Sequence, residues 1–194
     1  MSSPQYDVVL YGATGFTGGL TAQYLATHPQ QPRVAFAGRN RSKLEKVRQG
    51  LTKVSKERME SIGLIEASAS DKASLTRMAQ SAKVVMNLVG PYSQLGGKDV
   101  AQAAVEAGAG YVDLTGETGY YAELVEQLHG PAQKNHSILL PSVGFDSMPF
   151  DLGAYLAVQE VKKVAGPKAQ VELALCGYNL SLIHISEPTR QEAI

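Results

Sequence analysis

The sequence predicts an α/β fold: a doubly wound parallel sheet, followed by the start of a second, α+β domain. Six short apolar runs typical of buried strands alternate with helical patterns over residues 1–150. Beyond Gly144 the pattern changes, because a long helical stretch leads into a segment of alternating polarity. Right-handed crossovers between successive strand and helix units give the expected strand order 3-2-1-4-5-6.

Each element rests on a local signal. Residues 83–90 form an almost continuous apolar run, which suits the centre of a parallel sheet. Ser42, with Glu45 three residues on, has the pattern of a capping box, and Asp71 is expected to cap the next helix. The strands are expected at residues 8–11, 33–38, 62–67, 83–90, 110–115 and 137–143. The helices are expected at residues 17–28, 42–54, 71–82, 98–107, 120–134 and 151–164, with a further strand at 169–176.

Composition excludes several classes of protein. Lys and Arg together number 18, as do Asp and Glu, so nothing favours nucleic acid or an anionic membrane as a partner. A single cysteine, Cys176, excludes an internal disulfide framework and fits a reducing compartment. There is no apolar run of about 20 residues and no signal-peptide pattern at the N-terminus. We expect a cytoplasmic location for these residues.

A glycine-rich turn follows the first expected strand and opens the first helix. A strand, a glycine turn and a helix N-terminus together form the junction that binds the pyrophosphate of a dinucleotide. Gly12 permits a tight turn, Gly15 lets the backbone approach the phosphates, and Gly18 lets the helix pack closely on the strand. The residues expected to contact the cofactor here are Gly12, Ala13, Thr14, Gly15, Phe16, Thr17 and Gly18.

The end of the second strand favours NADP over NAD. NAD-binding proteins usually carry an acidic residue there for the ribose 2′-hydroxyl, whereas this chain reads Gly38-Arg-Asn-Arg41. The guanidinium of Arg39 suits a 2′-phosphate, and Lys43 lies one turn further on. The alternative, a solvated loop charge at Arg39, stays open.

The chain resembles the saccharopine dehydrogenase-like oxidoreductase family, close to its trans-acting enoyl reductase branch. The resemblance covers almost all of residues 6–155. The family usually carries aspartates after the third strand, where this chain has Ser68 and Ser70. The matching segments are Tyr11-Gly-Ala-Thr-Gly-Phe-Thr-Gly18, Ala37-Gly-Arg39, Val89-Gly-Pro-Tyr92, Tyr111-Val-Asp-Leu-Thr-Gly-Glu117 and Gly144-Phe-Asp-Ser-Met-Pro-Phe-Asp-Leu-Gly153.

Further candidates follow the later strands. Gly90 and Pro91 follow the fourth strand, where their backbone is expected to approach the nicotinamide ribose. Tyr92 is expected either to flank the nicotinamide or donate to a substrate carbonyl, or to be a surface turn residue.

Acidic residues follow the fifth and sixth strands. Asp113 and Thr115 share one face of the fifth strand, and Glu117 is aimed at the crevice, where it could orient substrate or relay a proton. Asp146 and Ser147 follow the sixth strand and could do the same, although Asp146 could instead cap a helix. For Glu117 and Asp146 the structural and functional interpretations both stay open, and no residue is assigned as catalytic.

The resemblance implies hydride transfer from NADPH to a C=C or C=N bond, in one form enoyl reduction in lipid metabolism. The implied partner is a small-molecule or lipid-like substrate, and any homo-oligomer is expected to form through the second domain. The alternative is a non-catalytic NADP(H)-sensing protein on the same fold. A short-chain reductase or nucleotide-sugar epimerase is disfavoured, because no tyrosine is followed by lysine at the Tyr-x-x-x-Lys spacing. Lipid or membrane association is left open for the full-length protein.

We expect the last 15 residues not to be natural protein sequence. Residues 180–190 are identical to the translation of a transposase-type sequencing-library adaptor, and residues 191–194 fit its continuation. We therefore expect residues 151–179 to begin a truncated substrate domain and residues 180–194 to be an artefact. Finding this tail encoded in genomic DNA would contradict that interpretation.

Overall fold

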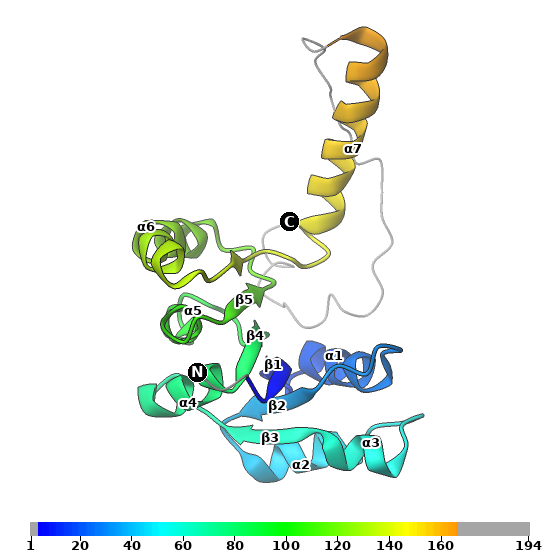
Figure 1. The fold of residues 1–194 in the computed structure, drawn as a ribbon, viewed down its shortest axis with the longest axis vertical. Helices are drawn as coiled ribbons and strands as arrows, with labels where there is room; N and C mark the ends of the chain where they lie inside the picture. Colours follow the sequence, from blue (N-terminus) through cyan, green and yellow to red (C-terminus); the bar gives the residue numbers. More distant parts are fainter. Residues whose placement is uncertain (1–3, 167–194) are drawn as a thin grey trace, which may run out of the picture. The chain divides into compact units, whose positions relative to one another are not determined.

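The computed structural model describes residues 4–166, which divide into two compact units between Ser147 and Met148. The first unit contains a six-stranded sheet with helices on both faces (Figure 1). The second unit is described only by one helix, α7 (Met148–Ala165). The expected strand at 169–176 and the tail at 180–194 lie outside the described residues, and the division of the chain at 150, 151 and 180 stays a prediction.

The sheet is parallel throughout and has the order β3-β2-β1-β4-β5-β6, as the sequence predicts. Its central pair joins β1 to β4, with Tyr11 opposite Asn87. The order reverses between these two strands, which places the switch point of a doubly wound sheet at their carboxyl ends. The strands are β1 (Tyr6–Tyr11), β2 (Val34–Gly38), β3 (Gly63–Glu66), β4 (Ala82–Asn87), β5 (Gly110–Asp113) and β6 (Leu139–Leu140).

Helices cover the two faces of the sheet with separate apolar cores. On one face α4, α5 and α6 bury side chains such as Leu75, Val100 and Leu124 against β1, β4 and β5. On the other face α1 and α2 pack Leu25 and Leu44 against β1 and β2. Figure 1 shows α4, α5 and α6 along one side of the strands and α1 on the other. The helices are α1 (Phe16–Thr27), α2 (Arg41–Gln49), α3 (Lys56–Ser61), α4 (Lys72–Gln80), α5 (Gly97–Glu106) and α6 (Thr118–Asn135).

The start of α2 corrects the expected capping box. Asn40 is the N-cap: its side-chain oxygen accepts a hydrogen bond from the Lys43 amide at 2.9 Å. Ser42 lies inside the helix and donates to the same oxygen, and Glu45 accepts from Arg48. Both Asn40 and Ser42 are good capping residues, and the end of β2 at Gly38 leaves room for the earlier one. Asp71 caps α4 as expected, through the Ser74 amide.

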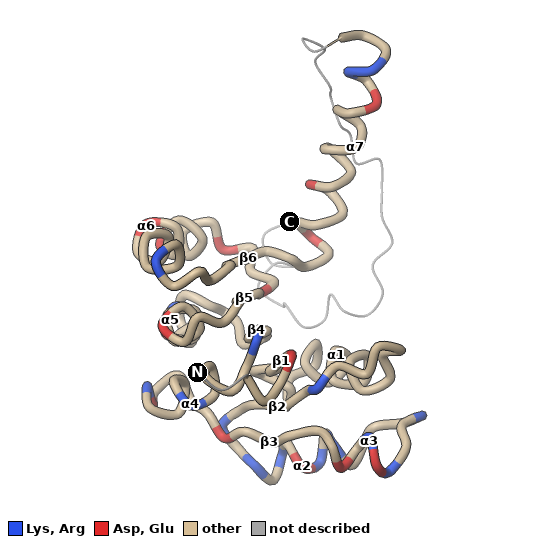
Figure 2. The backbone as a smooth tube through the Cα atoms, viewed as in Figure 1, with Lys and Arg blue, Asp and Glu red and all other residues tan. Residues whose placement is uncertain are grey.

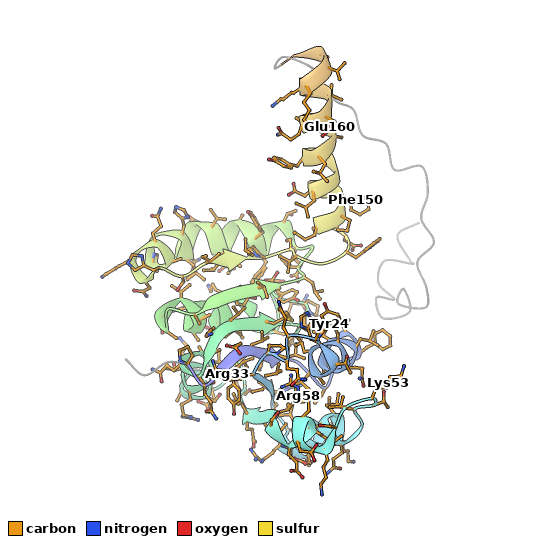
Figure 3. All side chains as sticks on the ribbon, turned by 45° about the vertical axis from the view of Figure 1, so that its right-hand side comes forward. Tyr24, Arg33, Lys53, Arg58, Phe150 and Glu160 are labelled. Carbon is orange, nitrogen blue, oxygen red and sulfur yellow. The ribbon has the colours of Figure 1, made fainter. Side chains whose placement is uncertain are left out.

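The helix expected at 42–54 ends at Gln49, and a short helix that was not expected, α3, follows at Lys56–Ser61. Its Arg58 ties the end of α1 to the entry of β2: the guanidinium donates to the carbonyls of Leu25, Ala26 and Pro32 at 2.8–3.3 Å (Figure 3). Burial lowers the pKa of Arg58, whose ordinary value is so high that the side chain stays charged. A cation at the last carbonyls of α1 also complements the helix dipole.

The sixth strand is shorter than expected, two residues rather than seven. Pro141 has no amide hydrogen to give to the sheet, and Ser142 adopts a positive φ of 62°. The next amides turn to Asp113 instead: Ser142 donates to its side chain at 2.9 Å and Val143 to its carbonyl at 2.8 Å. Strand pairing is therefore replaced by hydrogen bonds to one residue at the end of β5.

Charged residues of both signs are interspersed along the helices of the first unit (Figure 2). At the amino ends of the central strands one carboxylate binds two cations. Asp7 accepts from the Arg33 amide and guanidinium and lies 2.8 Å from Lys83 Nζ, which links β1, β2 and β4. The Arg33 side chain, then Lys83 and the Arg33 amide, hold the pKa of Asp7 well below its usual range.

We expect Asp7→Asn to lower the free energy of unfolding by about 1 kcal/mol at pH 7. A carboxyl whose pKa is depressed by folding contributes stability above its ordinary pKa and loses it as the pH falls through the folded value. The difference between wild type and variant should therefore shrink as the pH is lowered from about 4. Urea denaturation at a series of pH values measures it, and a difference independent of pH would contradict the assignment.

Candidate functional site

The loops after β1 and β4 meet at the switch point of the sheet. Gly12 follows β1 with a φ of 93°, a conformation that a side chain disfavours. A Cβ atom at Gly12 would lie 2.7 Å from Val89 Cγ2 and 3.1 Å from the Leu88 carbonyl carbon. The two loops are therefore too close to admit any residue but glycine at this position.

The glycine turn leads directly into α1. Gly15 is the N-cap, with no side-chain cap, and no acidic residue occupies the first turn of the helix. Thr14 to Thr17 are exposed, while Ala13 is buried. The first amides of α1, together with the helix dipole, therefore face solvent and suit an anionic group such as a pyrophosphate.

Gly18 sets how closely α1 packs on this turn. A Cβ atom there would fall on the Gly12 carbonyl oxygen and 2.9 Å from Ala13 Cα. The neighbouring Gly19 has nothing within 4 Å of an added Cβ. Of these two glycines, only Gly18 is required by the packing, which agrees with the role expected from the sequence.

Arg39 lies at the carboxyl end of β2, beside the same edge of the sheet. Its side chain is exposed, and within residues 4–166 no hydrogen bond or ion pair engages its guanidinium. Burial raises the pKa of the Tyr11 hydroxyl, against a hydrogen bond with the backbone of Ala69 and the positive charge of Arg39, which both lower it. Arg39 is therefore close to the ends of β1 and β3, and Lys43 is exposed on the first turn of α2.

A pair of serines follows β3 at the carboxyl edge of the sheet. The Ser68 and Ser70 hydroxyls are 2.9 Å apart, and the Ser68 amide donates to Ser74 Oγ. The Ala67 amide donates to the Gly38 carbonyl at 3.1 Å, which holds this loop next to Arg39. The loop that carries the two hydroxyls therefore lies beside the end of β2.

Gly90 and Pro91 are exposed after β4, joined by a cis peptide bond, but the Tyr92 side chain is buried. Its hydroxyl donates to the Asn87 carbonyl at 3.0 Å and accepts from the Leu114 amide at 3.3 Å. Burial contradicts the expected surface turn, and the engaged hydroxyl is not free to donate to a substrate carbonyl. That Tyr92 flanks the nicotinamide stays a prediction.

Glu117 is also engaged rather than free. One carboxylate oxygen accepts from the Tyr92 amide at 2.6 Å, and the other accepts from the Ser93 amide at 3.1 Å and from the Ser93 hydroxyl. Burial raises the pKa of Glu117, but the hydrogen bonds from Ser93 and Tyr92 outweigh it, so the net pKa is lowered. The side chain is thus held ionised against the loop after β4 and is not aimed at the crevice.

A buried polar cluster around Tyr111, near the loop after β4, was not predicted from the sequence. The Tyr111 hydroxyl donates to Asp113 at 2.9 Å and accepts from Asn87 Nδ2 at 3.1 Å. A hydroxyl has one hydrogen, so Tyr120, 2.9 Å away, must donate to Tyr111. Burial raises the pKa of both tyrosines, which therefore remain protonated at neutral pH. The available signals were two polar residues at strand ends, Asn87 at the end of β4 and Asp113 at the end of β5.

The remaining candidates, Asp146 and Ser147, follow β6. Asp146 is exposed, and its two interpretations stay open. The Ser147 amide donates to the Gly144 carbonyl at 3.2 Å. In the described part of the chain, no group of three or more His, Cys, Asp or Glu residues could hold a metal ion, and no helix is long and apolar enough to cross a membrane.

Comparison with protein families matches residues 8–140 to the saccharopine dehydrogenase NADP-binding domain. A trans-acting enoyl reductase of Mycobacterium ulcerans is 37% identical over 182 residues, 92% of this chain and 42% of the relative. A putative trans-acting enoyl reductase of Mycobacterium tuberculosis is 40% identical over 151 residues, 78% of this chain and 35% of the relative. A lipid droplet localized protein of Caenorhabditis elegans is 38% identical over 77% of this chain and 35% of its own length. The chain thus spans about two fifths of these relatives.

Solved structures show the same fold at low sequence identity. Saccharopine dehydrogenase from Saccharomyces cerevisiae aligns with a TM-score of 0.64 and 19% identity, over 81% of this chain and 32% of the other. Triphenylmethane reductase of Citrobacter sp., solved with NADP(H), aligns with a TM-score of 0.51 and 17% identity, over 70% of this chain and 48% of the other.

We expect Gly18→Ala to lower the free energy of unfolding by about 2 kcal/mol or more, because the new methyl group meets backbone that cannot give way. Gly19→Ala is the matched control. Its added methyl meets open space, and alanine favours the helix by up to about 1 kcal/mol. Thermal unfolding of both variants measures the difference, and equal effects would contradict the close approach of α1 to Gly12.

Proposed function

The chain belongs to the saccharopine dehydrogenase NADP-binding domain family, and we propose that it is the cofactor-binding part of an NADP-dependent oxidoreductase that reduces a C=C or C=N bond. The observation that carries the proposal is the match over residues 8–140, which contains both loops of the switch point. The cofactor supplies a hydride when bound. The protein supplies binding and orientation at the carboxyl edge of the sheet.

Each part of the cofactor has a proposed contact. Within the Gly12–Gly18 turn, the amides at the start of α1 bind the pyrophosphate, in line with the exposure of Thr14 to Thr17. Arg39 binds the 2′-phosphate, which its unpaired guanidinium favours over a ribose hydroxyl. The backbone of Gly90, Pro91 and Tyr92 borders the nicotinamide ribose.

The substrate is proposed to be a lipid-like molecule with an enoyl group. The trans-acting enoyl reductases among the relatives support reduction of a C=C bond, and the lipid droplet localized relative supports association with lipid. Tyr92 and Glu117 are both engaged, so we propose that the group completing substrate protonation lies outside residues 4–166. Residues 151–179 are proposed to begin the substrate domain, and residues 180–194 to be the adaptor artefact.

The second candidate is an NADP(H)-sensing protein that never turns its cofactor over. The engaged state of Tyr92 and Glu117 favours it for these residues taken alone. Both candidates bind NADPH, but only the enzyme oxidises it. The deciding experiment follows the loss of NADPH absorbance by the full-length protein with a panel of enoyl and imine substrates. Binding without oxidation of NADPH by any of them would favour the sensor.

We expect Arg39→Ala to weaken NADPH binding about tenfold or more, because a charge-assisted hydrogen bond contributes about 1.5–3 kcal/mol. NADH binding should change little, since NADH has no 2′-phosphate. Arg41→Ala removes the same charge two residues away, where the guanidinium already binds the Leu64 carbonyl at 3.3 Å, and it should leave the preference intact. Calorimetric titration with both cofactors measures the ratio, and an unchanged preference in Arg39→Ala would remove Arg39 from the site.

A further inference from the structure

We propose that Glu117 is a positioning residue, whose carboxylate aligns the Gly90–Ser93 loop for the nicotinamide half of NADP. The inference rests on the proposed function and deepens it, since it separates the nicotinamide side of the site from the adenosine side. It starts from the three hydrogen bonds that Glu117 accepts across 24–25 residues of sequence.

Glu117 stands at the N-cap of α6 but does not cap that helix with its side chain. The carboxylate turns instead to the amides of Tyr92 and Ser93, which are consecutive in the loop after β4. Two adjacent backbone amides that point to one carboxylate have little freedom to rotate. The peptide planes next to Gly90 and Pro91 are therefore fixed before any ligand arrives.

The position of Glu117 is itself determined by a ladder of alternate residues at the end of β5. Asp113 Oδ1 accepts from the Thr115 amide at 3.0 Å, and Thr115 Oγ1 accepts from the Glu117 amide at 3.0 Å. Asp113 and Thr115 are buried, at 1% and 2% exposure. The spacing Asp-x-Thr-x-Glu thus links the buried end of β5 to Glu117, and through Glu117 to the exposed loop after β4.

The loop can be shifted without unfolding the domain, because its contacts with Glu117 are at the surface while the core lies below. Ser93 is exposed and Glu117 is partly exposed. The adenosine side, around Arg39 and Ser68, lies across β1 at the ends of β2 and β3. A change at Glu117 should therefore affect one half of the dinucleotide only.

The experiment uses Glu117→Gln in the 194-residue chain with two ligands, NADPH and 2′-phospho-ADP-ribose, which carries the same pyrophosphate and 2′-phosphate but no nicotinamide. An amide side chain has only one acceptor oxygen and brings a donor toward the loop amides. We expect the Kd for NADPH to rise about tenfold, and the Kd for 2′-phospho-ADP-ribose to stay within about twofold.

Glu123→Gln is the matched control, because Glu123 also lies on α6 and also binds a neighbouring element, through Lys98 Nζ at 2.6 Å on α5. It should leave both dissociation constants unchanged. Ser93→Ala removes one of the three hydrogen bonds and should act in the same direction as Glu117→Gln but more weakly, and it serves if Glu117→Gln does not fold.

Equal loss of both ligands in a folded Glu117→Gln, or loss of neither, would overturn the positioning role. A wild-type chain that binds 2′-phospho-ADP-ribose as tightly as NADPH would also overturn it, while leaving the proposed cofactor site in place. A wild-type chain that binds neither ligand would reject the proposed function itself, and the inference with it.

Discussion

The close approach of three backbone segments at Gly12 is the constraint on which the carboxyl edge of the sheet depends. The turn after β1, the start of α1 at Gly18 and the loop after β4 at Val89 meet there with no space for a side chain. This packing brings the amides of α1 next to the end of the central strand pair. A dinucleotide lying across β1 and β4 would meet a helix N-terminus on one side and the Gly90–Ser93 loop on the other.

At the carboxyl end of β5, the same edge of the sheet is held by hydrogen bonds between polar groups. Asp113 is buried and accepts hydrogen bonds from Tyr111, Thr115 and Ser142. Every buried polar side-chain atom of the described residues has a partner. A buried group left without its partner costs about 1–3 kcal/mol, so a satisfied cluster favours one arrangement over its alternatives. The hydroxyls of Tyr111 and Tyr120 are both engaged within this cluster.

Apolar runs and glycine spacing were enough to predict the strand order, the glycine turn and the cap at Asp71, because these depend on local patterns. The cap at Asn40 was missed because Asn40 and Ser42, two residues apart, are both suitable capping residues. The end of β2 decides between them. The roles of Tyr92 and Glu117 were out of reach for a different reason. The Tyr92 hydroxyl accepts from the Leu114 amide and the Glu117 carboxylate accepts from the Tyr92 amide, both across more than 20 residues. Periodicity says nothing about which distant groups meet.

The central claim is that the loops after β1 and β4 together bind one NADP molecule, and backbone amide NMR of the 194-residue chain tests it most directly. The account predicts that saturating NADPH shifts the amide signals of Gly12–Gly18 and Gly90–Ser93, while those in the groove between α4 and α5 around Lys72 and Gln102 stay in place. Shifts confined to the α4–α5 groove, or none at the glycine turn, would contradict it.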